Sequence, residues 1–341
     1  MQIHQKKEII SATKDLYVFN PEHDMALGVN VEIYTPPNEV VKLRKEKSLL
    51  PAIYAGNSDF ILIPDDLEDR DLPGLEYYDL VKDKDNKLIR YRDLHFYKEE
   101  IRRVIPWGWD RSIRFLLANS GIDREKLPTN EIINKIRELS HRRTVIEVRN
   151  VISSILNEPP KNLPKELFSL SEVEIFLQLN PVSFFKAPWS SSGRGIVVSD
   201  HISRKGLLEW CHGIIKKQKS VMAERAWDRL FDFATEWDMI EGEAFFRGYS
   251  VFKASSRGKY HGNITGSQNE LKHLISLHAP KFNCEIINAQ KTALEKIIGK
   301  SYTGPLGIDL LADTQGEINA CVEINLRNTM GHILLEFQKK D

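Results

Sequence analysis

Short apolar runs near the start of the chain indicate where its first strands lie. Residues 16–19 and 60–63 each end in a turn that contains proline, which is typical of buried strands. Residues 38–50, between them, have helical composition, and Asn38 is the expected N-cap. Strand, helix and strand in this order predict a βαβ unit with a partly parallel sheet.

Beyond residue 100 the chain alternates helical spacing with short β-rich runs. Helical spacing covers residues 110–118, 130–139, 144–156, 207–217 and 291–298. The β-rich runs cover residues 184–187, 195–199, 220–224, 232–240, 244–253, 307–312 and 317–325. An antiparallel hairpin is predicted where only Glu241, Gly242 and Glu243 separate two of these runs. We therefore expect an α/β (α+β) fold.

Length and composition indicate more than one folded unit. A chain of 341 residues is too long for one ordinary core, so two or three packed units are expected. Residues 123–129, which include Pro128, are the expected boundary after the first unit. Hydrophobic residues make up 41% and charged residues 28% of the chain, which is typical of a soluble globular protein.

The charge balance argues against a protein that binds nucleic acid. Lys and Arg number 48, as do Asp and Glu, so the formal net charge is zero. Nucleic-acid-binding proteins are more often basic or carry a basic tail. The small clusters at Arg142–Arg143 and Lys216–Lys217 are expected on solvated helix faces.

Cysteine spacing and hydropathy favour a cytoplasmic location. Cys211, Cys284 and Cys321 form no CxxC pair, which argues against a disulfide framework and a structural zinc site. The polar N-terminal segment has no signal-peptide core, and no run approaches the roughly 18 apolar residues of a membrane span. No long heptad pattern indicates an oligomeric state, which stays unknown.

A loop rich in serine and glycine, Trp189–Gly195, joins two of the expected strands. Its residues after the tryptophan are Ser190, Ser191, Ser192, Gly193, Arg194 and Gly195. Small residues let backbone N–H groups approach a phosphate, and Lys186 can add a positive charge to the same oxygens. The alternative is a flexible surface hairpin, because the loop is neither a Walker A motif nor a GxGxxG turn.

Three oxygen-bearing side chains near the C-terminus predict a metal site. Glu323 and Asn325 are two residues apart on one strand and therefore share a face, and the preceding turn can bring Asp309 alongside them. Mg²⁺ takes few protein oxygens and completes its shell with phosphates and waters. The alternative is a hairpin whose polar face lies in water. Against it, Val322, Ile324 and Leu326 indicate a strand that is buried on its other face.

In their order along the chain, these elements resemble the ATP-grasp superfamily. The resemblance rests on Lys186, the Ser/Gly loop, an acidic strand and the Asp309…Glu323-x-Asn325-x-Arg327 ending. It implies an ATP-grasp fold of two α+β subdomains preceded by an N-terminal α/β domain. The expected division is an N-terminal domain over 1–125, a subdomain with the phosphate loop over 126–220 and a subdomain with the metal site over 221–341.

The resemblance also implies roles for individual residues. Lys186 would contact the α- and β-phosphates, and residues 190–195 would form a lid over them. Backbone groups of the linker that ends at Ala226 would bind adenine, and Glu224 would take its amino group. Asp232 would bind the ribose hydroxyls, with Glu236 as the second choice.

The remaining implied roles concern phosphate and metal. A second lysine usually precedes the loop in this superfamily, and Arg142 or Arg143 would replace it here. Arg327 would steady the transferred phosphoryl group or the acyl phosphate. The implied metal ligands are Asp309, Glu323 and Asn325, and weaker candidates for the γ-phosphate are Arg247 and Lys253.

Such proteins typically activate a carboxylate as an acyl phosphate, which an amine or a thiol then displaces. The resemblance therefore implies an ATP-dependent carboxylate–amine (or thiol) ligase that uses Mg²⁺ (or Mn²⁺) and converts ATP to ADP and phosphate. Its substrates would be small molecules or peptides that bear a carboxylate and an amine, with no membrane partner. The alternatives are a kinase of the same fold and a non-catalytic ATP-binding protein.

Three further segments have two interpretations each. Residues 20–24, which include His23 and Asp24, follow a strand, so they either contact the second substrate or form a capped turn. Residues 106–109 either stack on a substrate or pack beneath a helix start. Residues 328–332 follow the metal strand, and His332 is either on the substrate side or on the surface.

Overall fold

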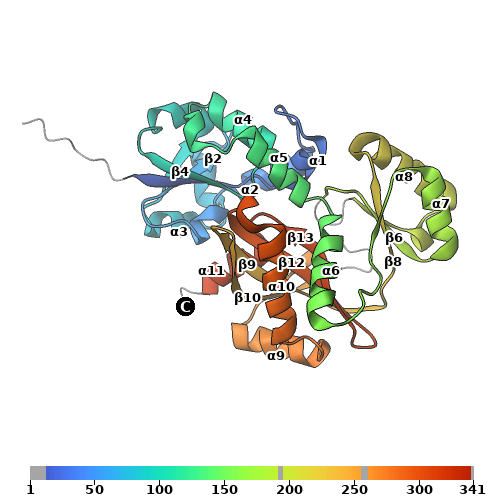
Figure 1. Cartoon of the computed structure of the whole chain (residues 1–341). Helices are drawn as coiled ribbons and strands as arrows, with labels where there is room; N and C mark the ends of the chain where they lie inside the picture. The colour runs from blue at the N-terminus through green and yellow to red at the C-terminus, as the bar shows by residue number, and fades with distance from the viewer. Residues whose placement is uncertain (1–12, 191–194, 255–259, 339–341) are drawn as a thin grey trace, which may run out of the picture. The chain divides into compact units, whose positions relative to one another are not determined.

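The computed structural model describes residues 13–190, 195–254 and 260–338 (Figure 1). The chain divides into two compact units, which we describe separately. The first unit contains residues 1–21, 37–107 and 113–128. The second unit contains residues 22–36, 108–112 and 129–341.

The first unit is built on a four-stranded parallel sheet of order β3-β2-β1-β4. Its strands are β1 (Lys14–Val18), β2 (Phe60–Ile63), β3 (Lys87–Arg90) and β4 (Ile101–Pro106). Its helices are α2 (Asn38–Glu46), α3 (Tyr78–Asp83) and α4 (Arg111–Asn119), with 3-10 turns η1 (Leu50–Ile53), η2 (Asp69–Gly74), η3 (Tyr91–Phe96) and η4 (Arg124–Lys126). The predicted parallel βαβ unit is confirmed, since β1 and β2 run parallel with α2 between them in sequence. The predicted N-cap was wrong by one residue, because Pro37 holds that position and Asn38 begins the helix.

The smaller sheet of the second unit is antiparallel, with the order β5-β8-β6-β7. Its strands are β5 (Lys165–Leu167), β8 (Val221–Arg225), β6 (Ser183–Lys186) and β7 (Ile196–Val198). Two helices share its core, α7 (Leu170–Leu179) and α8 (Arg204–Gln218). Phe185 of β6, Phe176 of α7 and Cys211 of α8 are buried together there.

The larger sheet of the second unit is a five-stranded antiparallel sheet of order β11-β10-β9-β12-β13. Its strands are β9 (Arg229–Ile240), β10 (Glu243–Ala254), β11 (Tyr260–Ile264), β12 (Gly304–Asp313) and β13 (Ile318–Asn325). The predicted hairpin is confirmed as the antiparallel pair β9 and β10. The other elements of the unit are α1 (His23–Val29), α5 (Asn130–Leu139), α6 (Thr144–Leu156), α9 (Gln268–His278), α10 (Cys284–Ile297), α11 (Met330–Gln338), η5 (Ser199–His201) and η6 (Gly299–Ser301).

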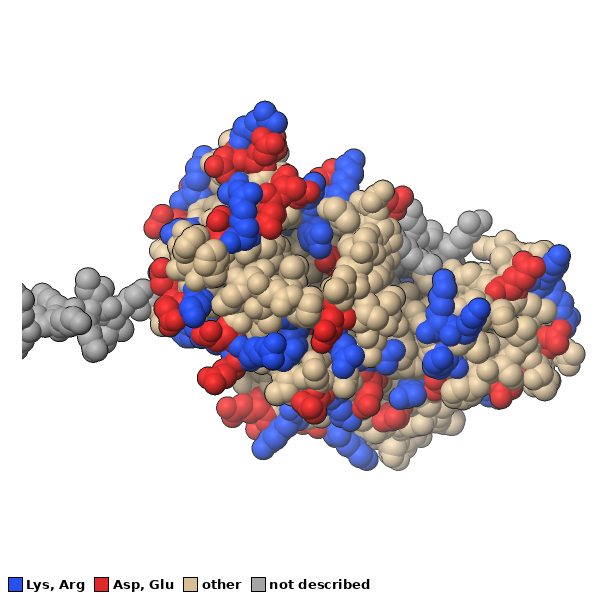
Figure 2. Space-filling view, turned by 90° about the horizontal axis from the view of Figure 1, so that it is seen from above, with Lys and Arg blue, Asp and Glu red and all other residues tan. Residues whose placement is uncertain are grey.

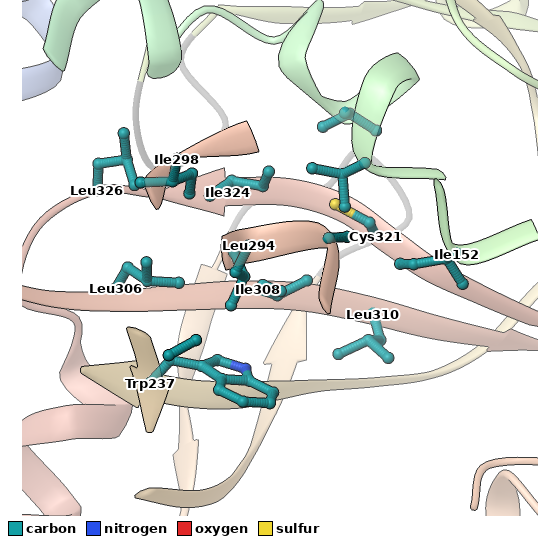
Figure 3. Packing of buried hydrophobic residues seen from close by; sticks show 14 of the residues in the cluster. Ile152, Trp237, Leu294, Ile298, Leu306, Ile308, Leu310, Cys321, Ile324 and Leu326 are labelled. Carbon is teal, nitrogen blue, oxygen red and sulfur yellow. The ribbon is translucent and has the colours of Figure 1, made fainter. Parts of the chain in front are cut away.

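One face of the five-stranded sheet supplies the largest hydrophobic core. Figure 3 shows Trp237 and Ile308 of the sheet gathered with Leu294 of α10 and Ile152 of α6. Alternation along β9 directs Phe233, Trp237 and Met239 into this core. The side chains between them in sequence that alternate with these lie on the opposite face. That opposite face carries the polar residues of the candidate site.

Charges of both signs are mixed on the surface. On the face drawn in Figure 2, Lys and Arg side chains are interspersed with Asp and Glu side chains. In the parts of the chain that the structure describes, no helix is both long and apolar enough to cross a membrane.

Candidate functional site

Strand pairing brings the three predicted metal ligands to one place on the sheet. Asp309 lies directly opposite Glu323, and Gly307 lies opposite Asn325 two positions along that register. The Asn325 amide nitrogen is 3.4 Å from Oδ2 of Asp309. Two carboxylates and one amide therefore share one face of the β12–β13 hairpin.

The charge around Asp309 suits a cation. Burial, together with the nearby carboxylates of Glu323 and Glu236, raises the pKa of the Asp309 carboxyl to about 8, although Arg327 and Asn325 oppose the shift. A divalent cation among these oxygens would relieve the same repulsion. Among the described residues, no group of three or more His, Cys, Asp or Glu side chains could hold a metal ion. A site here would need the amide oxygen of Asn325 as its third ligand. That oxygen accepts from Arg327, and the amide nitrogen faces Asp309.

Arg142 joins the Glu323 carboxylate of β13 to the base of the Ser/Gly loop. Its guanidinium donates to Oε1 of Glu323 at 2.7 Å and to Oγ of Ser190 at 2.7 Å. It also donates to the carbonyl of Ala187 at 2.5 Å. The expectation that Arg142 lies on a solvated helix face was wrong, since the residue is 6% exposed and precedes α6 inside the site. Long-range pairing with Glu323, which local spacing does not show, is the reason for its burial.

A small cavity lies beside Arg142. Lys186 and Glu224 form an ion pair at its edge. The cavity is lined by Arg142, Val145, Pro164, Lys186, Met222, Ala223, Glu224 and Val322. Val322 was expected on the buried face of its strand, but it lines the cavity because β13 bulges opposite the Asp309–Leu311 segment of β12. With a volume of about 10 Å³, the cavity has room for about one water molecule, and its lining combines apolar side chains with three charged ones.

Two further predicted nucleotide contacts, Ala226 and Asp232, lie just after β8 and on β9. The backbone N–H of Ala226 donates to the carbonyl of Val182 at 3.0 Å, so this N–H is already used within the sheet. Asp232 lies opposite Leu311 on the polar side of β9 and accepts a hydrogen bond from Arg229 at 2.5 Å. Burial raises the pKa of Asp232, although Arg229 opposes the shift.

The start of the Ser/Gly loop is held firmly at Trp189. Its backbone N–H donates to Gln218 at 3.0 Å, and its indole N–H donates to the carbonyl of Arg137 at 2.9 Å. The Arg137 guanidinium also lies over the indole ring at 3.7 Å from its centroid. Gly195 ends the loop, and a Cβ there would overlap Ser190, so the position needs glycine. The predicted contacts Ser191, Ser192, Gly193 and Arg194 lie outside the described residues.

Arg327 is held by three separate segments. Its Nε donates to Oδ2 of Asp24 at 2.9 Å, its second terminal nitrogen donates to Oδ1 of Asn325 at 3.0 Å, and its first to the carbonyl of Asn328 at 3.0 Å. Burial alone would lower the pKa of Arg327, but the carboxylates of Asp24, Glu323 and Asp309 together raise it. The guanidinium therefore stays charged next to Glu323 and Asp309, two of the three predicted metal ligands.

Comparison with known proteins identifies the architecture. No family model matches the sequence, and no curated protein matches it. Among solved structures, a biotin carboxylase from Campylobacter jejuni in complex with β-γ-ATP aligns at TM-score 0.56 and 13% identity, over 95% of this chain and 67% of that chain. The chain has the ATP-grasp fold.

Two further structures agree with the ATP-grasp assignment. A D-cycloserine synthetase aligns at TM-score 0.52 and 10% identity, over 95% of this chain and 97% of that chain. An N5-carboxyaminoimidazole synthetase from Staphylococcus aureus, complexed with ADP, aligns at TM-score 0.52 and 10% identity, over 94% and 72% of the two chains. At such low identity the similarity establishes the fold alone, and the predicted fold class is confirmed.

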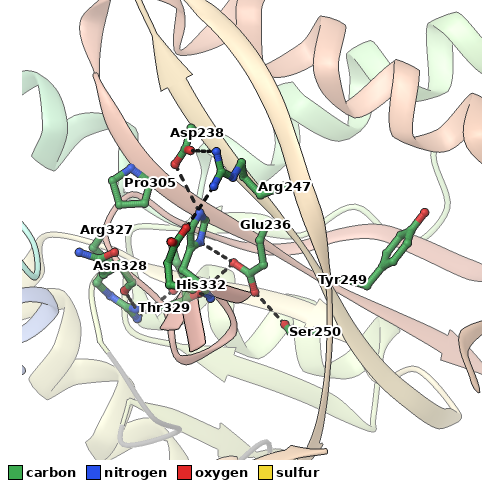
Figure 4. A network of polar contacts seen from close by, with 12 residues as sticks. Glu236, Asp238, Arg247, Tyr249, Ser250, Pro305, Arg327, Asn328, Thr329 and His332 are labelled. Atoms are coloured by element: carbon green, nitrogen blue, oxygen red, sulfur yellow. Dashed lines mark hydrogen bonds and ion pairs between the residues drawn. The ribbon is translucent and has the colours of Figure 1, made fainter. Parts of the chain in front are cut away.

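A buried network on the same sheet face of this ATP-grasp fold centres on Glu236 (Figure 4). The Glu236 carboxylate accepts hydrogen bonds from Ser250 at 2.7 Å, from Thr329 at 2.8 Å and from His332 Nδ1 at 3.0 Å. Glu236 is 1% exposed and all three donors point at it, so it does not suit the second-choice ribose role. Nε2 of His332 lies 3.5 Å from Asp238.

Sequence reasoning did not find this network. The surface alternative for His332 was wrong, since the residue is buried against Glu236. The available signal was Gly331, where any Cβ would overlap the Glu236 carboxylate, together with Thr329, which caps α11 by accepting from His332 N–H at 3.0 Å. Of the weaker γ-phosphate candidates, Arg247 pairs with Asp238 and Glu336, both at 3.1 Å, and Lys253 is exposed.

Proposed function

We propose that the protein is an ATP-dependent ligase that joins a carboxylate to an amine, or less commonly to a thiol. One observation supports this most directly: Asp309, Glu323 and Asn325 lie together with Arg327 on one side and with Arg142 on the other. Such a set can neutralise phosphate oxygens without any protein nucleophile. Solved structures with the same fold include complexes with β-γ-ATP and with ADP.

Asp309, Glu323 and Asn325 would hold Mg²⁺ (or Mn²⁺). The raised pKa of Asp309 supports this assignment, because Arg327 only partly offsets the burial of this carboxyl and its repulsion from Glu323 and Glu236. Bound there, the ion would supply positive charge for the phosphate oxygens of ATP.

The cavity beside Arg142 would have to widen from its volume of about 10 Å³ to take the adenine of ATP between Met222 and Val322. Glu224 would accept from the adenine amino group, and Asp232 would bind the ribose hydroxyls. Lys186 and Arg142 would contact phosphates, and residues 190–195 would complete the phosphate site. We keep the division into residues 1–125, 126–220 and 221–341 as part of this proposal.

The proposed reaction has two steps, and negative charge accumulates in both. An oxygen of the substrate carboxylate attacks the γ-phosphorus, and the bond to the β-phosphate oxygen breaks to release ADP. The amine then attacks the carbonyl carbon of the acyl phosphate, phosphate leaves, and the amine loses a proton to solvent. Arg327 would stabilise the negative charge that accumulates in both steps. The substrates would be small molecules or peptides that bear a carboxylate and an amine.

Calorimetry with ATP and ADP, each with and without Mg²⁺, tests the site directly. We expect metal-dependent binding by the wild type and its loss in Glu323→Ala and Asn325→Ala. Glu317→Ala is a matched control, because Glu317 adjoins the same hairpin but pairs with surface lysines. Nucleotide binding that depends neither on Mg²⁺ nor on the Glu323 side chain would contradict the proposed metal site.

A panel of acids and amines, assayed for ADP release and by mass spectrometry, tests the reaction. An amide product is expected. A stable phosphorylated product would instead identify a kinase, and binding without turnover on any substrate would favour a non-catalytic role.

A further inference from the structure

Residues 20–24, for which the sequence left two interpretations open, contact Arg327, the predicted catalytic arginine. Asp24 is the second residue of α1, and its carboxylate is the acceptor for Nε–H of Arg327, 303 residues away in sequence. The Asp24 and Arg327 side chains are both about one-sixth exposed, which is partial burial, so their ion pair is shielded from much of the solvent.

Helix α1 is itself fixed at both ends. At its start, His23 is fully buried with Nδ1 3.4 Å from Oδ2 of Asp110, and a Cβ on Gly108 would lie 2.6 Å from the His23 ring. Near its end, Arg137 Nε donates to the carbonyl of Leu27 at 2.6 Å. Asp24 therefore projects from a helix that has little freedom to move relative to these contacts.

The bonds to Arg327 determine its orientation. A guanidinium has five N–H donors in one plane. Within the described chain, each nitrogen of the Arg327 guanidinium donates one hydrogen bond. Nε donates to Asp24, and the two terminal nitrogens donate to the side chain of Asn325 and to the carbonyl of Asn328. Three acceptors on α1, β13 and the following loop define the plane, and one donor on each terminal nitrogen remains for a ligand.

We propose that Asp24 is a positioning residue for the ligase site: by holding Nε of Arg327, it directs the two remaining donors toward the transferred phosphoryl group. The inference rests on the proposed function and adds the N-terminal segment to the active site. Asn325 and the Asn328 carbonyl are neutral acceptors, so Asp24 is the charged member of this set, and its loss would free the guanidinium to turn toward Glu323 or Asp309.

Binding of two nucleotides separates this role from a purely structural one. Calorimetry would compare MgADP with the magnesium complex of β,γ-imido-ATP, because only the second carries the group that Arg327 would contact. For Asp24→Asn we expect about tenfold weaker imido-ATP binding with unchanged ADP binding. Arg327→Lys should show the same selective loss, and the double variant should lose no more than Arg327→Lys alone.

Asp15→Asn is the matched control, since Asp15 also pairs with arginines, Arg102 and Arg103, but in the first unit. It should leave the affinity for both nucleotides unchanged. If Asp24→Asn leaves imido-ATP binding unchanged, weakens both nucleotides equally, or adds fully to Arg327→Lys, the positioning role is refuted. If the wild type binds neither nucleotide, the proposed function itself fails, which is a distinct result.

Discussion

Two carboxylates on the same face of the five-stranded sheet have opposite surroundings. Glu236 on β9 accepts hydrogen bonds from two hydroxyls and a histidine. Asp309 on the neighbouring strand β12 has Asn325 at 3.4 Å and lies near two more carboxylates, which with burial raise its pKa to about 8. The two groups are close in the sheet, yet Glu236 has three hydrogen-bond donors directed at it, whereas at Asp309 the nearby Arg327 and Asn325 only partly offset burial and repulsion.

Under the proposed function, this difference would separate a structural carboxylate from a ligand-binding one. A buried carboxylate with complete hydrogen bonding contributes to the folded state and has no capacity for a ligand. A buried carboxylate without compensation costs stability, and the cost is removed when a cation binds. The comparison therefore predicts that equivalent substitutions at the two positions affect different properties.

Removal of the Glu236 charge should have the largest effect on stability. Glu236→Gln places an amide N–H₂ against the Ser250 and Thr329 donors and leaves the buried imidazolium of His332 with only the more exposed Asp238 carboxylate. We expect the free energy of unfolding to fall by about 3–5 kcal/mol, the usual cost of breaking a buried charge pair. Urea denaturation of the unligated protein measures it, and a loss below about 1 kcal/mol would mean that the network is not structural.

The pH dependence of stability should come next in size. Burial lowers the pKa of His332, but hydrogen bonds and charge from Asp238 and Glu236 outweigh it and raise the pKa from 6.5 to about 9. The folded protein therefore binds more protons than the unfolded chain between these values. The stabilisation is complete below pH 6.5 and is lost as the pH rises through 9.

A shift of this size corresponds to at most about 3.4 kcal/mol. Denaturation at a series of pH values between these limits and just beyond them measures it, with His332→Gln as the control that should flatten the slope. An equal slope in wild type and His332→Gln would show that His332 is not the titrating group.

Substitution of Asp309 should affect ligand binding instead. Asp309→Asn keeps the shape and an oxygen but removes one metal-binding charge, so MgADP should bind about a hundredfold more weakly, or ~2.7 kcal/mol. ADP affinity without metal should be unchanged. The unligated variant should be as stable as the wild type or more stable, because the repulsion from Glu323 and Glu236 is relieved. A marked loss of stability would place Asp309 in the same class as Glu236 and remove the contrast.

Local patterns predicted the elements that carry their own signals. Helices α5 (Asn130–Leu139) and α6 (Thr144–Leu156) begin and end at the predicted residues, and Thr129 caps α5 by accepting from Ile132 N–H. Helix α1 was not predicted as a helix, since it has seven residues and its N-cap, Glu22, makes no side-chain cap bond. A short helix without a cap depends on tertiary contacts that spacing does not contain.

The candidate site also contains contacts that local patterns predicted and contacts that they did not. Opposition of Asp309 to Glu323 followed from strand alternation and a short turn. Pairing of Arg142 with Glu323 joins residues 181 positions apart, and pairing of His332 with Glu236 joins residues 96 apart. No local pattern encodes such pairs. Strict alternation also does not predict the bulge in β13 that turns Val322 toward the cavity.

The smallest expected effect lies at the exposed end of the Glu236 network. The Arg247 side chain is 32% exposed, and its partners Asp238 and Glu336 are 24% and 31% exposed, so solvent screens both ion pairs. Arg247→Met keeps the aliphatic stem and should cost less than about 1 kcal/mol of unfolding free energy. Binding of the magnesium complex of β,γ-imido-ATP should be unchanged, because both carboxylate partners already occupy the guanidinium. A tenfold loss in that binding, measured by calorimetry, would restore Arg247 as a γ-phosphate contact and extend the ligand-binding region of the sheet face beyond Asp309.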